Sequence, residues 1–498
     1  MQDHILPSMT ARASVVERVT KSVKWCALME ITSRAAQPVI FVILAKILTP
    51  ADFGLMGMAM VVISFSQVFW DAGLGRALVQ TSQPIEKASN VVFWANLTLA
   101  LLTYAFLFAS APLLSDFFRV RGCETVFRIL GLQVVLQSIG AVQQFLLVRD
   151  FGFRKLFWAK LAMVVVPGFF SIPMAILGCG VWALVAGTLV GSLTNVVILW
   201  LKSPWRPRWE FDWQVARRLF AFGGWLLAES IGIWFVASGD QLILARWIGM
   251  TDLGIYRVAT NISVLIFAFL INPVIPVLYP MFSKLQNDHA EFRLIFRKVN
   301  TLIIFITLPV MGGILLLGNP LANAIFGQSW KGLGFQLSIL TCAAGMGWIV
   351  GANGEAFRAI GRPDINTKFM YLQLLIYIPA YFSAPWLGIE RFVLLKLAIS
   401  IITAVIQVVI CSRILHMSRL YPLIDGKHLM SATAAMFLVV GIGLHFLPIG
   451  MNAPWAIVGL GLAILLGSVA YILVLWLIAR PFILSTGRLM FRAIADME

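Results

Sequence analysis

The residues of this sequence best suited to chemistry are the few charged side chains inside long apolar segments. Glu30 and Arg34 are four residues apart, so they share one face of a helix, whereas Glu229 and Arg257 lie in two other apolar segments. A charge at membrane depth costs about 2.5–3.5 kcal/mol, so each must have a compensating role. An arginine there can hold a phosphate group with its forked N–H donors, and a carboxyl group can bind a proton or another cation.

Each of these charges also has a structural interpretation. Glu30 and Arg34 could neutralise each other and only hold a helix bundle together. Arg257 could extend to the lipid headgroups. Glu229 must be protonated, paired with Arg34 or Arg257, or exposed to a wet cavity.

Four further charges lie in apolar segments. Asp71 and Asp240 are additional candidates for ion coupling, although they are nearer the ends of their segments, where a helix-end or loop role is the simpler interpretation. Lys160 and Lys396 are expected to extend along their helices to the headgroups.

Composition places these residues in an integral membrane protein. The chain has 498 residues, of which 60% are hydrophobic and only 12% charged, whereas a soluble domain has about 25% charged residues. About fourteen apolar segments are long enough to cross a bilayer as helices, so we expect an all-α membrane fold. The predicted spans are 24–45, 54–75, 90–112, 126–146, 157–177, 180–201, 219–243, 253–276, 299–318, 333–354, 369–386, 391–412, 431–448 and 454–478.

The distribution of the positive charges indicates a topology. A formal net charge of +16 could suit a nucleic-acid partner, but the cations gather in alternate loops, as the positive-inside rule requires. With both termini inside, the number of spans is even. The opposite face receives only Lys46, Arg119, Arg121, Arg128, Arg246, Lys331 and Arg391.

Several sequence signatures of enzymes and metal proteins are missing. The chain has no G-x-x-x-x-G-K-[ST] phosphate loop, no D-x-D and no large outer loop, so catalysis is not expected. Its 5 histidines are dispersed, and its 5 cysteines show no C-x-x-C spacing. We expect no metal, no disulfide framework and no cofactor other than H⁺ or Na⁺ as a coupling ion.

A short pattern occurs twice, 200 residues apart. Leu44-Ala45-Lys46 followed by Asp52-Phe53-Gly54 recurs as Leu244-Ala245-Arg246 followed by Asp252-Leu253-Gly254. The repeat predicts two six-helix lobes in parallel orientation around a central path, at 1–212 and 213–430, with an appended helix pair at 431–498. Asp52 and Asp252 are interpreted as helix caps, and the glycines as points of close helix contact.

Longer motifs give the chain a family resemblance that covers nearly its whole length. They are Leu48-Thr49-Pro50-Ala51-Asp52-Phe53-Gly54, Asp71-Ala72-Gly73-Leu74-Gly75-Arg76-Ala77-Leu78-Val79-Gln80, Leu147-Val148-Arg149-Asp150-Phe151-Gly152-Phe153-Arg154, Gly180-Val181-Trp182-Ala183-Leu184-Val185-Ala186-Gly187, Gly239-Asp240-Gln241 and Ala359-Ile360-Gly361-Arg362-Pro363-Asp364. The first two are the more specific. Together they resemble bacterial polysaccharide transporters of the Wzx/WzxC type, in the superfamily that also contains multidrug/toxin extruders and the lipid II flippase.

The resemblance implies a function and a substrate. The expected activity is that of an inner-membrane flippase, which moves undecaprenyl-pyrophosphate-linked oligosaccharide units across the membrane by alternating access, for exopolysaccharide, capsule or O-antigen export. Its partners would be the lipid-linked oligosaccharide, membrane lipids and the polymerase and export machinery. The alternatives are a multidrug or cation antiporter of the same superfamily and, less favoured, a membrane polysaccharide polymerase or ligase.

The resemblance also assigns roles to residues. Arg34 and Arg257 hold places comparable to cavity arginines of the lipid II flippase branch, although the first repeat has Gly57 where the second has Arg257. Trp225 and Trp234 are candidates for sugar contacts, because they share a predicted helix with Glu229. The ion-coupling candidates are Glu30, Glu229, Asp71 and Asp240.

Prolines mark a candidate gate in the eighth predicted span. Pro273 and Pro276 remove backbone hydrogen bonds within one turn of each other, so the helix can kink there. The alternative is a static bend that packing tolerates.

The carboxyl group of Glu229 gives the first prediction. If it binds the coupling ion, Glu229→Gln should impair transport, because an amide cannot exchange a proton or balance a cation. The measurement is the pH and sodium dependence of transport in reconstituted vesicles. A variant with the same dependence as the unaltered protein would contradict this role.

Overall fold

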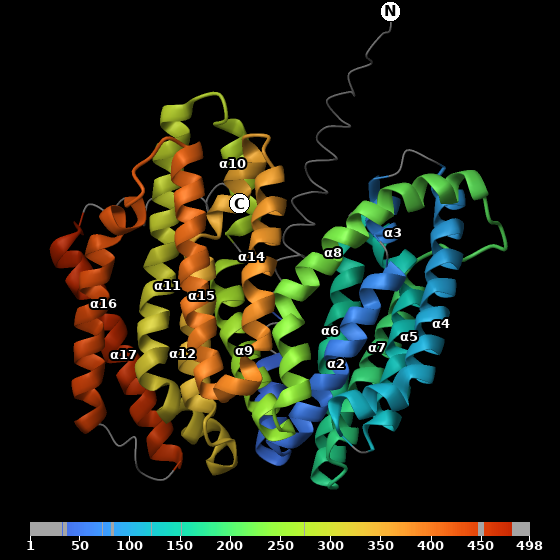
Figure 1. The fold of residues 1–498 in the computed structure, drawn as a ribbon, viewed down its shortest axis with the longest axis horizontal. Coiled ribbons are helices and arrows are strands. Elements are labelled where there is room, and N and C mark those ends of the chain that lie inside the picture. Colours follow the sequence, from blue (N-terminus) through green and yellow to red (C-terminus); the bar gives the residue numbers. More distant parts are fainter. Residues whose placement is uncertain are drawn as a thin grey trace, which may run out of the picture. The chain divides into compact units, whose positions relative to one another are not determined.

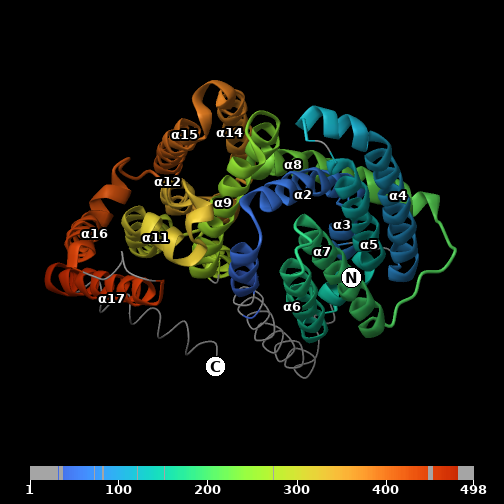
Figure 2. The ribbon, with the colours of Figure 1, turned by 90° about the horizontal axis from the view of Figure 1, so that it is seen from below.

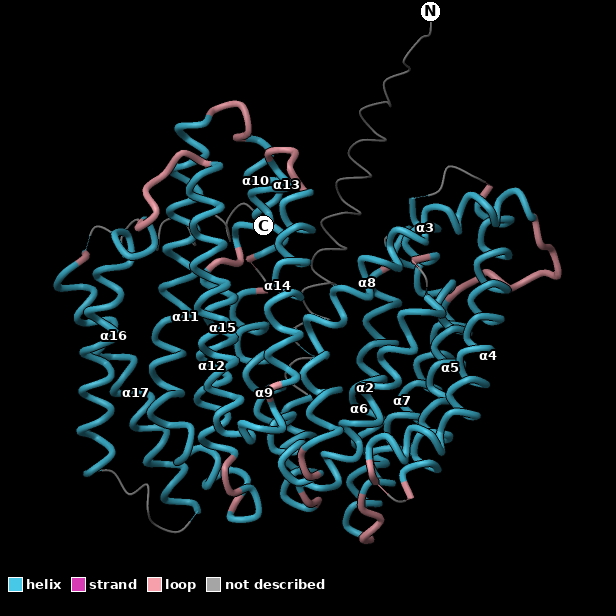
Figure 3. The backbone as a smooth tube through the Cα atoms, viewed as in Figure 1, coloured by secondary structure: helices cyan, strands magenta, loops and turns pink. Residues whose placement is uncertain are grey.

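The structure is a computed structural model in which every described element is a helix (Figure 3). It describes Thr32 and residues 37–71, 73–80, 84–120, 122–150, 152–272, 274–446 and 453–480. Within this part, 11 helices are long and apolar enough to cross a membrane. The predicted all-α membrane fold is therefore confirmed, whereas the count of fourteen spans is not.

The described residues form two compact units. Unit 1 contains residues 37–48 and 55–234, and unit 2 contains residues 49–54 and 235–480. Two helices pass from one unit to the other. They are α2 (Pro50–Asp71), which crosses after Gly54, and α8 (Trp213–Trp247), which crosses after Trp234.

Unit 1 is built on a simple pattern of neighbouring helices. Its other helices are α3 (Leu74–Gln80), α4 (Ile85–Phe118), α5 (Cys123–Arg149), α6 (Phe153–Ile176) and α7 (Val181–Lys202). Helix α4 packs on α5, α5 on α7, and α6 on α7 (Figure 2). The α6 and α7 backbones approach closely because Gly187 faces Ser171, whose Oγ would lie 1.9 Å from a Cβ at the glycine.

Unit 2 repeats this pattern and adds two helices. Its helices after α8 are α9 (Met250–Ile271), α10 (Ile275–Lys284), α11 (His289–Phe326), α12 (Leu333–Ile349), α13 (Ala352–Ala359), α14 (Asp364–Phe382), α15 (Ala384–Ile414), α16 (Tyr421–Phe446) and α17 (Ala453–Ile478). Helix α11 packs on α12, α12 on α15, and α14 on α15, which matches unit 1 pair for pair. Helices α16 and α17 pack on each other and on α11 (Figure 1).

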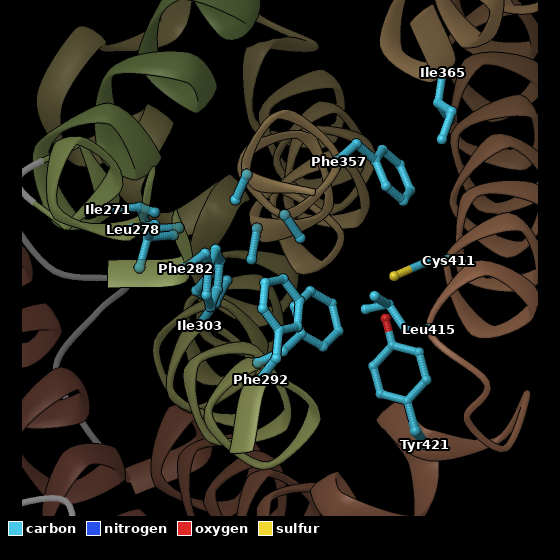
Figure 4. Close-up of a cluster of buried hydrophobic side chains, with 14 of the residues drawn as sticks. Ile271, Leu278, Phe282, Phe292, Ile303, Phe357, Ile365, Cys411, Leu415 and Tyr421 are labelled. Carbon is cyan, nitrogen blue, oxygen red and sulfur yellow. The ribbon is translucent and has the colours of Figure 1, made fainter. Parts of the chain in front are cut away.

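The core of unit 2 is aromatic at the end where α10 and α13 lie (Figure 4). The Phe282 ring of α10 lies 5.3 Å from that of Phe292 and 6.0 Å from that of Phe296, both on α11. Tyr421, at the start of α16, lies 5.9 Å from Phe296. Burial of such rings contributes roughly 1.5–3 kcal/mol each, so the short helix α10 is held by side chains rather than by its own length.

The predicted capping role is confirmed for Asp52 and wrong for Asp252, because Gly249 is the N-cap of α9 and no side chain caps that helix. The hydroxyl of Thr49 accepts the backbone N–H of Asp52 (3.3 Å), while the Asp52 carboxylate accepts the backbone N–H of Thr49 (3.0 Å). This reciprocal pair is a capping box at the start of α2. Pro50 occupies the first helical position, where its missing N–H costs nothing.

The two repeat glycines lie against each other's helix within unit 2. A Cβ at Gly54 would lie 1.9 Å from the carbonyl oxygen of Met250, and a Cβ at Gly254 would lie 1.9 Å from that of Pro50. The first turns of α2 and α9 therefore touch backbone to backbone. The predicted close helix contact is confirmed, and each repeat supplies one half of it.

The proline-rich segment separates two helices. Helix α9 ends at Ile271 and α10 begins at Ile275, so the predicted span 253–276 is not one continuous helix. Pro276 lies in the first turn of α10, where proline is tolerated, and Pro273 is outside the described residues. A gating role for this break stays a prediction.

The glycine contact generates a stability prediction. Gly54→Ala and Gly254→Ala should each destabilise the fold by about 1–3 kcal/mol, because the two backbones must separate to admit a methyl group. Thermal unfolding in detergent measures the loss. Gly441→Ala in α16 is the matched control, since a Cβ there meets nothing within 4 Å. Equal unfolding temperatures for Gly54→Ala and the control would contradict the close contact.

Candidate functional site

A buried cluster of polar groups joins three helices of unit 2. The Tyr256 hydroxyl of α9 donates to Asp240 Oδ2 of α8 (2.5 Å). Lys396 Nζ of α15 donates to the same oxygen and to the Tyr256 hydroxyl oxygen (2.7 Å). The other carboxylate oxygen, Oδ1, accepts the backbone N–H of Gln241 (2.7 Å). The Asp240 carboxylate is thus held by three donors.

Asp240 and Tyr256 lie well inside their helices. Asp240 precedes the end of α8 at Trp247 by seven residues, which is about 10 Å along the axis, and Tyr256 follows the start of α9 by a similar distance. Lys396 follows Gly388, where a φ of 70° interrupts α15. This break divides α15 into two parts, and Lys396 lies in the part after Gly388.

Aromatic rings cover the cluster on one side. Phe392, one turn before Lys396, lies 6.1 Å from the Tyr256 ring and 6.4 Å from the ring of Tyr381 in α14. Tyr381 in turn stacks on Tyr377 at 5.7 Å. The side chain of Asp240 is only 2% exposed and that of Lys396 19%. In such surroundings either charge without the other would be strongly unfavourable.

The chemistry of this cluster is charge compensation. Asp240 and Lys396 are an oppositely charged pair, and the Tyr256 hydroxyl bridges them as both donor and acceptor. No group of three or more His, Cys, Asp and Glu side chains suited to a metal ion occurs in the described part of the chain. The arrangement can hold, gain or lose a proton, and it joins α8, α9 and α15.

Sequence reasoning identified only one member of the cluster. Asp240 was an ion-coupling candidate, but Lys396 was expected to reach the headgroups, and this expectation is wrong because its ammonium group bonds inside the bundle. The available signal was the presence of opposite charges in the predicted spans 219–243 and 391–412. Tyr256 carried no such signal, since a tyrosine in an apolar helix is common.

The other described candidates are on the three helices α2, α8 and α9. Glu229 is exposed in α8, Asp71 is partly buried at the last position of α2, and Arg257 is partly buried in α9. Trp234 is buried, donates its Nε1–H to Ser64 Oγ (3.0 Å) and packs 4.6 Å from the ring of Phe65. Their roles in ion coupling and substrate binding stay predictions.

Some candidates lie outside what the structure describes. Glu30 and Arg34 are among the residues not described, as are the side chains of Trp225 and Pro276. Their assigned roles stay predictions as well.

The motif at residues 359–364 is a charged turn between α13 and α14. Gly361 has a φ of 75°, and the backbone N–H of Arg362 donates to the carbonyl of Phe357 (2.8 Å), which ends α13. Arg362 and Lys368 both donate to the Asp364 carboxylate at 3.0 Å and lower its pKa to about 2. The motif therefore builds a turn and carries no binding site that the structure reveals.

The described helices, paired alike in two repeats, define a multi-pass membrane transporter fold. The lipid II flippase MurJ in an inward closed conformation shares it with a TM-score of 0.70 at 16% identity, over 92% of this chain and 100% of that one. An inward-facing MATE multidrug transporter shares this fold with a TM-score of 0.60 at 12% identity, over 77% of this chain and 94% of that one.

The sequence comparisons give the family. The chain belongs to the family described as polysaccharide biosynthesis proteins, whose model matches residues 43–333. The chain is 28% identical over 332 residues to the succinoglycan biosynthesis transport protein ExoT of Rhizobium meliloti (strain 1021), covering 66% of each. It is 25% identical over 375 residues to the lipopolysaccharide biosynthesis protein WzxC of Escherichia coli (strain K12), covering 74% of this chain and 75% of that protein.

These matches confirm the family resemblance seen in the motifs. The protein is a membrane transporter of polysaccharide biosynthesis rather than an enzyme, as the family and the transport protein among its relatives indicate.

The buried pair generates a stability prediction. Asp240→Asn or Lys396→Met alone should destabilise unit 2 by about 3–5 kcal/mol, because each leaves its partner buried without a counter-charge. The double variant Asp240→Asn/Lys396→Met should recover much of this loss. Thermal unfolding of the detergent-solubilised protein is the measurement.

The control is a more exposed ion pair in the same unit. Arg297 of α11 forms a two-pronged pair with Asp425 of α16, and its side chain is 45% exposed. Arg297→Met/Asp425→Asn should cost about 1 kcal/mol or less. A double variant of the buried pair that unfolds as early as either single variant would contradict mutual compensation.

Proposed function

We propose that the protein is a flippase of the bacterial inner membrane that exports undecaprenyl-pyrophosphate-linked oligosaccharide units by alternating access. The observation that carries this proposal is the combination of family and fold. The family model covers residues 43–333, and the fold matches the whole of a lipid II flippase with a TM-score of 0.70. The exported units would serve exopolysaccharide, capsule or O-antigen assembly.

The proposed substrate has three parts with different requirements. Its pyrophosphate is anionic and suits arginine side chains, which is the role we assign to Arg34 and Arg257. Its sugars are polar and require a wet path, with Trp225 and Trp234 as the proposed sugar contacts. Its polyprenyl tail is apolar and can stay in the lipid.

The connections between the two units are suited to rocking of one unit against the other. In the described part of the chain the backbone crosses between units at three points, after Leu48, after Gly54 in α2 and after Trp234 in α8. Few crossing points allow each unit to move as a body, which is the basis of alternating access in transporters built from repeats.

The charge distribution supports an orientation for this cycle. The cations of alternate loops would face the cytoplasm together with both termini, by the positive-inside rule. In this orientation substrate would enter from the cytoplasmic leaflet, where it would be supplied, and polymerase and export machinery would take it up outside.

Substitution of the two arginines tests the proposal. Arg34→Ala and Arg257→Ala should abolish surface polysaccharide and leave lipid-linked units inside, because the pyrophosphate loses its charge-assisted hydrogen bonds. The measurement is polysaccharide output in cells that carry only the variant gene, with membrane insertion checked on blots. Arg413→Ala is the control, because Arg413 is exposed at the end of α15.

Two outcomes would contradict the proposal. Normal polysaccharide output from both arginine variants would remove the phosphate-binding role. Transport of cationic dyes by vesicles that fail to move lipid-linked oligosaccharide would instead favour the multidrug antiporter.

A further inference from the structure

The Asp240 cluster contains its own cation. Asp240 Oδ2 accepts both the Lys396 ammonium group and the Tyr256 hydroxyl, and Oδ1 accepts the Gln241 backbone N–H. The ammonium group lies 2.7 Å from the hydroxyl oxygen of Tyr256 and 5.2 Å from the centre of its ring, so it contacts the hydroxyl edge of the ring. The carboxylate is therefore neutralised by a cation that is covalently part of α15.

This arrangement leaves little place for a metal ion. Hard cations take several oxygen ligands at once. Here Asp240 Oδ2 and the Tyr256 hydroxyl oxygen already share the Lys396 ammonium group, so a sodium ion bound by these two oxygens would have to displace it. A proton needs no such coordination shell and can bind to a single carboxylate oxygen.

In the described part of the chain, aromatic side chains of α14 and α15 lie beside the cluster. Tyr381 of α14 is packed against α8 at Gly239 and stacks on Tyr377, so the groups that can titrate near the cluster are tyrosines. Helix α12 packs against both α9 and α15 and has no Asp, Glu, Lys, Arg or His in its sequence. The helices of the cluster carry further charges at other positions, namely Arg217, Arg218, Glu229, Arg246, Asp252, Arg257, Glu390, Arg391 and Arg413.

The cluster occurs in one repeat only. At the offset of 200 residues, Asp240 corresponds to Ile40 and Tyr256 to Met56, and both of these side chains are apolar. A charged pair needed only to hold helices together would be required equally in both repeats, because the helices of the two repeats pair in the same way. Its presence in one repeat favours a role in the transport cycle.

We propose that Asp240, Tyr256 and Lys396 form the proton-coupling site of this transporter, with Lys396 standing in the place of a free metal cation. One proton from solution binds an oxygen of the Asp240 carboxylate, and Lys396 keeps its own proton, so the cluster changes from neutral to a charge of +1. The Lys396 ammonium group then loses its partner, and its partly exposed side chain can turn toward water. Helix α15 is thereby released from α8 and α9 until the proton leaves.

This inference rests on the proposed function and specifies its energy source. It can be tested without the sugar substrate. Full-length protein in vesicles adsorbed on a sensor should give a transient current after a pH jump, and at constant pH a sodium jump should give less than a tenth of that current.

Removal of both charges should abolish the response while preserving the fold. Asp240→Asn/Lys396→Met should reduce the pH-jump current at least tenfold, whereas Arg297→Met/Asp425→Asn should retain it. Loss of the pH-jump current in Asp240→Asn/Lys396→Met, with retention of the current in Arg297→Met/Asp425→Asn, supports the site. A current of half or more of the unaltered value in the Asp240/Lys396 variant, or a current driven by sodium and not by pH, would overturn it.

A milder substitution tests the hydroxyl group. Tyr256→Phe removes one donor from the Asp240 carboxylate, so a proton should bind more readily and the midpoint of the pH response should move about one unit toward higher pH. An unchanged midpoint would overturn the role of Tyr256.

Transport of lipid-linked oligosaccharide separates this inference from the function it rests on. If vesicles transport the substrate at a rate that an imposed pH gradient does not change, the coupling site is wrong and the flippase proposal stands. If pH-jump currents appear but lipid-linked oligosaccharide is never moved, the flippase proposal is wrong and the coupling site stands.

Discussion

A charge inside a membrane bundle must find its counter-charge inside the bundle, and in this protein Asp240 and Lys396 meet that constraint together. Their helices, α8 and α15, are far apart in the sequence, and Tyr256 of α9 completes the contact. While both charges are present, the three helices pack stably only when these groups meet, because each charge alone would be buried without compensation. The pair therefore links the fold of unit 2 to any process that changes its protonation.

A second constraint acts where the repeats meet. The first turns of α2 and α9 touch through Gly54 and Gly254, and no larger residue fits at either position. Here the two repeats are equivalent, and their contact is symmetrical and structural. The polar cluster is the opposite case, because its counterparts at residues 40 and 56 are apolar. The helices that the two repeats share thus form the scaffold, and only the second repeat carries the buried charge pair.

Much of the architecture could be predicted from patterns local in the sequence. Runs of about 20 apolar residues predict helices because each backbone group must be satisfied within its own segment. The repeat at residues 44–54 and 244–254 predicted a duplicated bundle, and the capping role of Asp52 followed from its place after Thr49-Pro50. The break between α9 and α10 was only suggested by its prolines, since proline permits a kink without requiring one.

The sequence by itself determined that this is a helical membrane protein with a twofold repeat, because hydrophobicity, helix length and repetition are properties of neighbouring residues. Its motifs also determined the family. Only the tertiary structure decided that Lys396 faces Asp240 and not the headgroups, and that Trp234 packs on Phe65. A side chain on a lipid-embedded helix can face lipid, a neighbouring helix or a polar partner, and which of these it meets depends on helices distant in the chain.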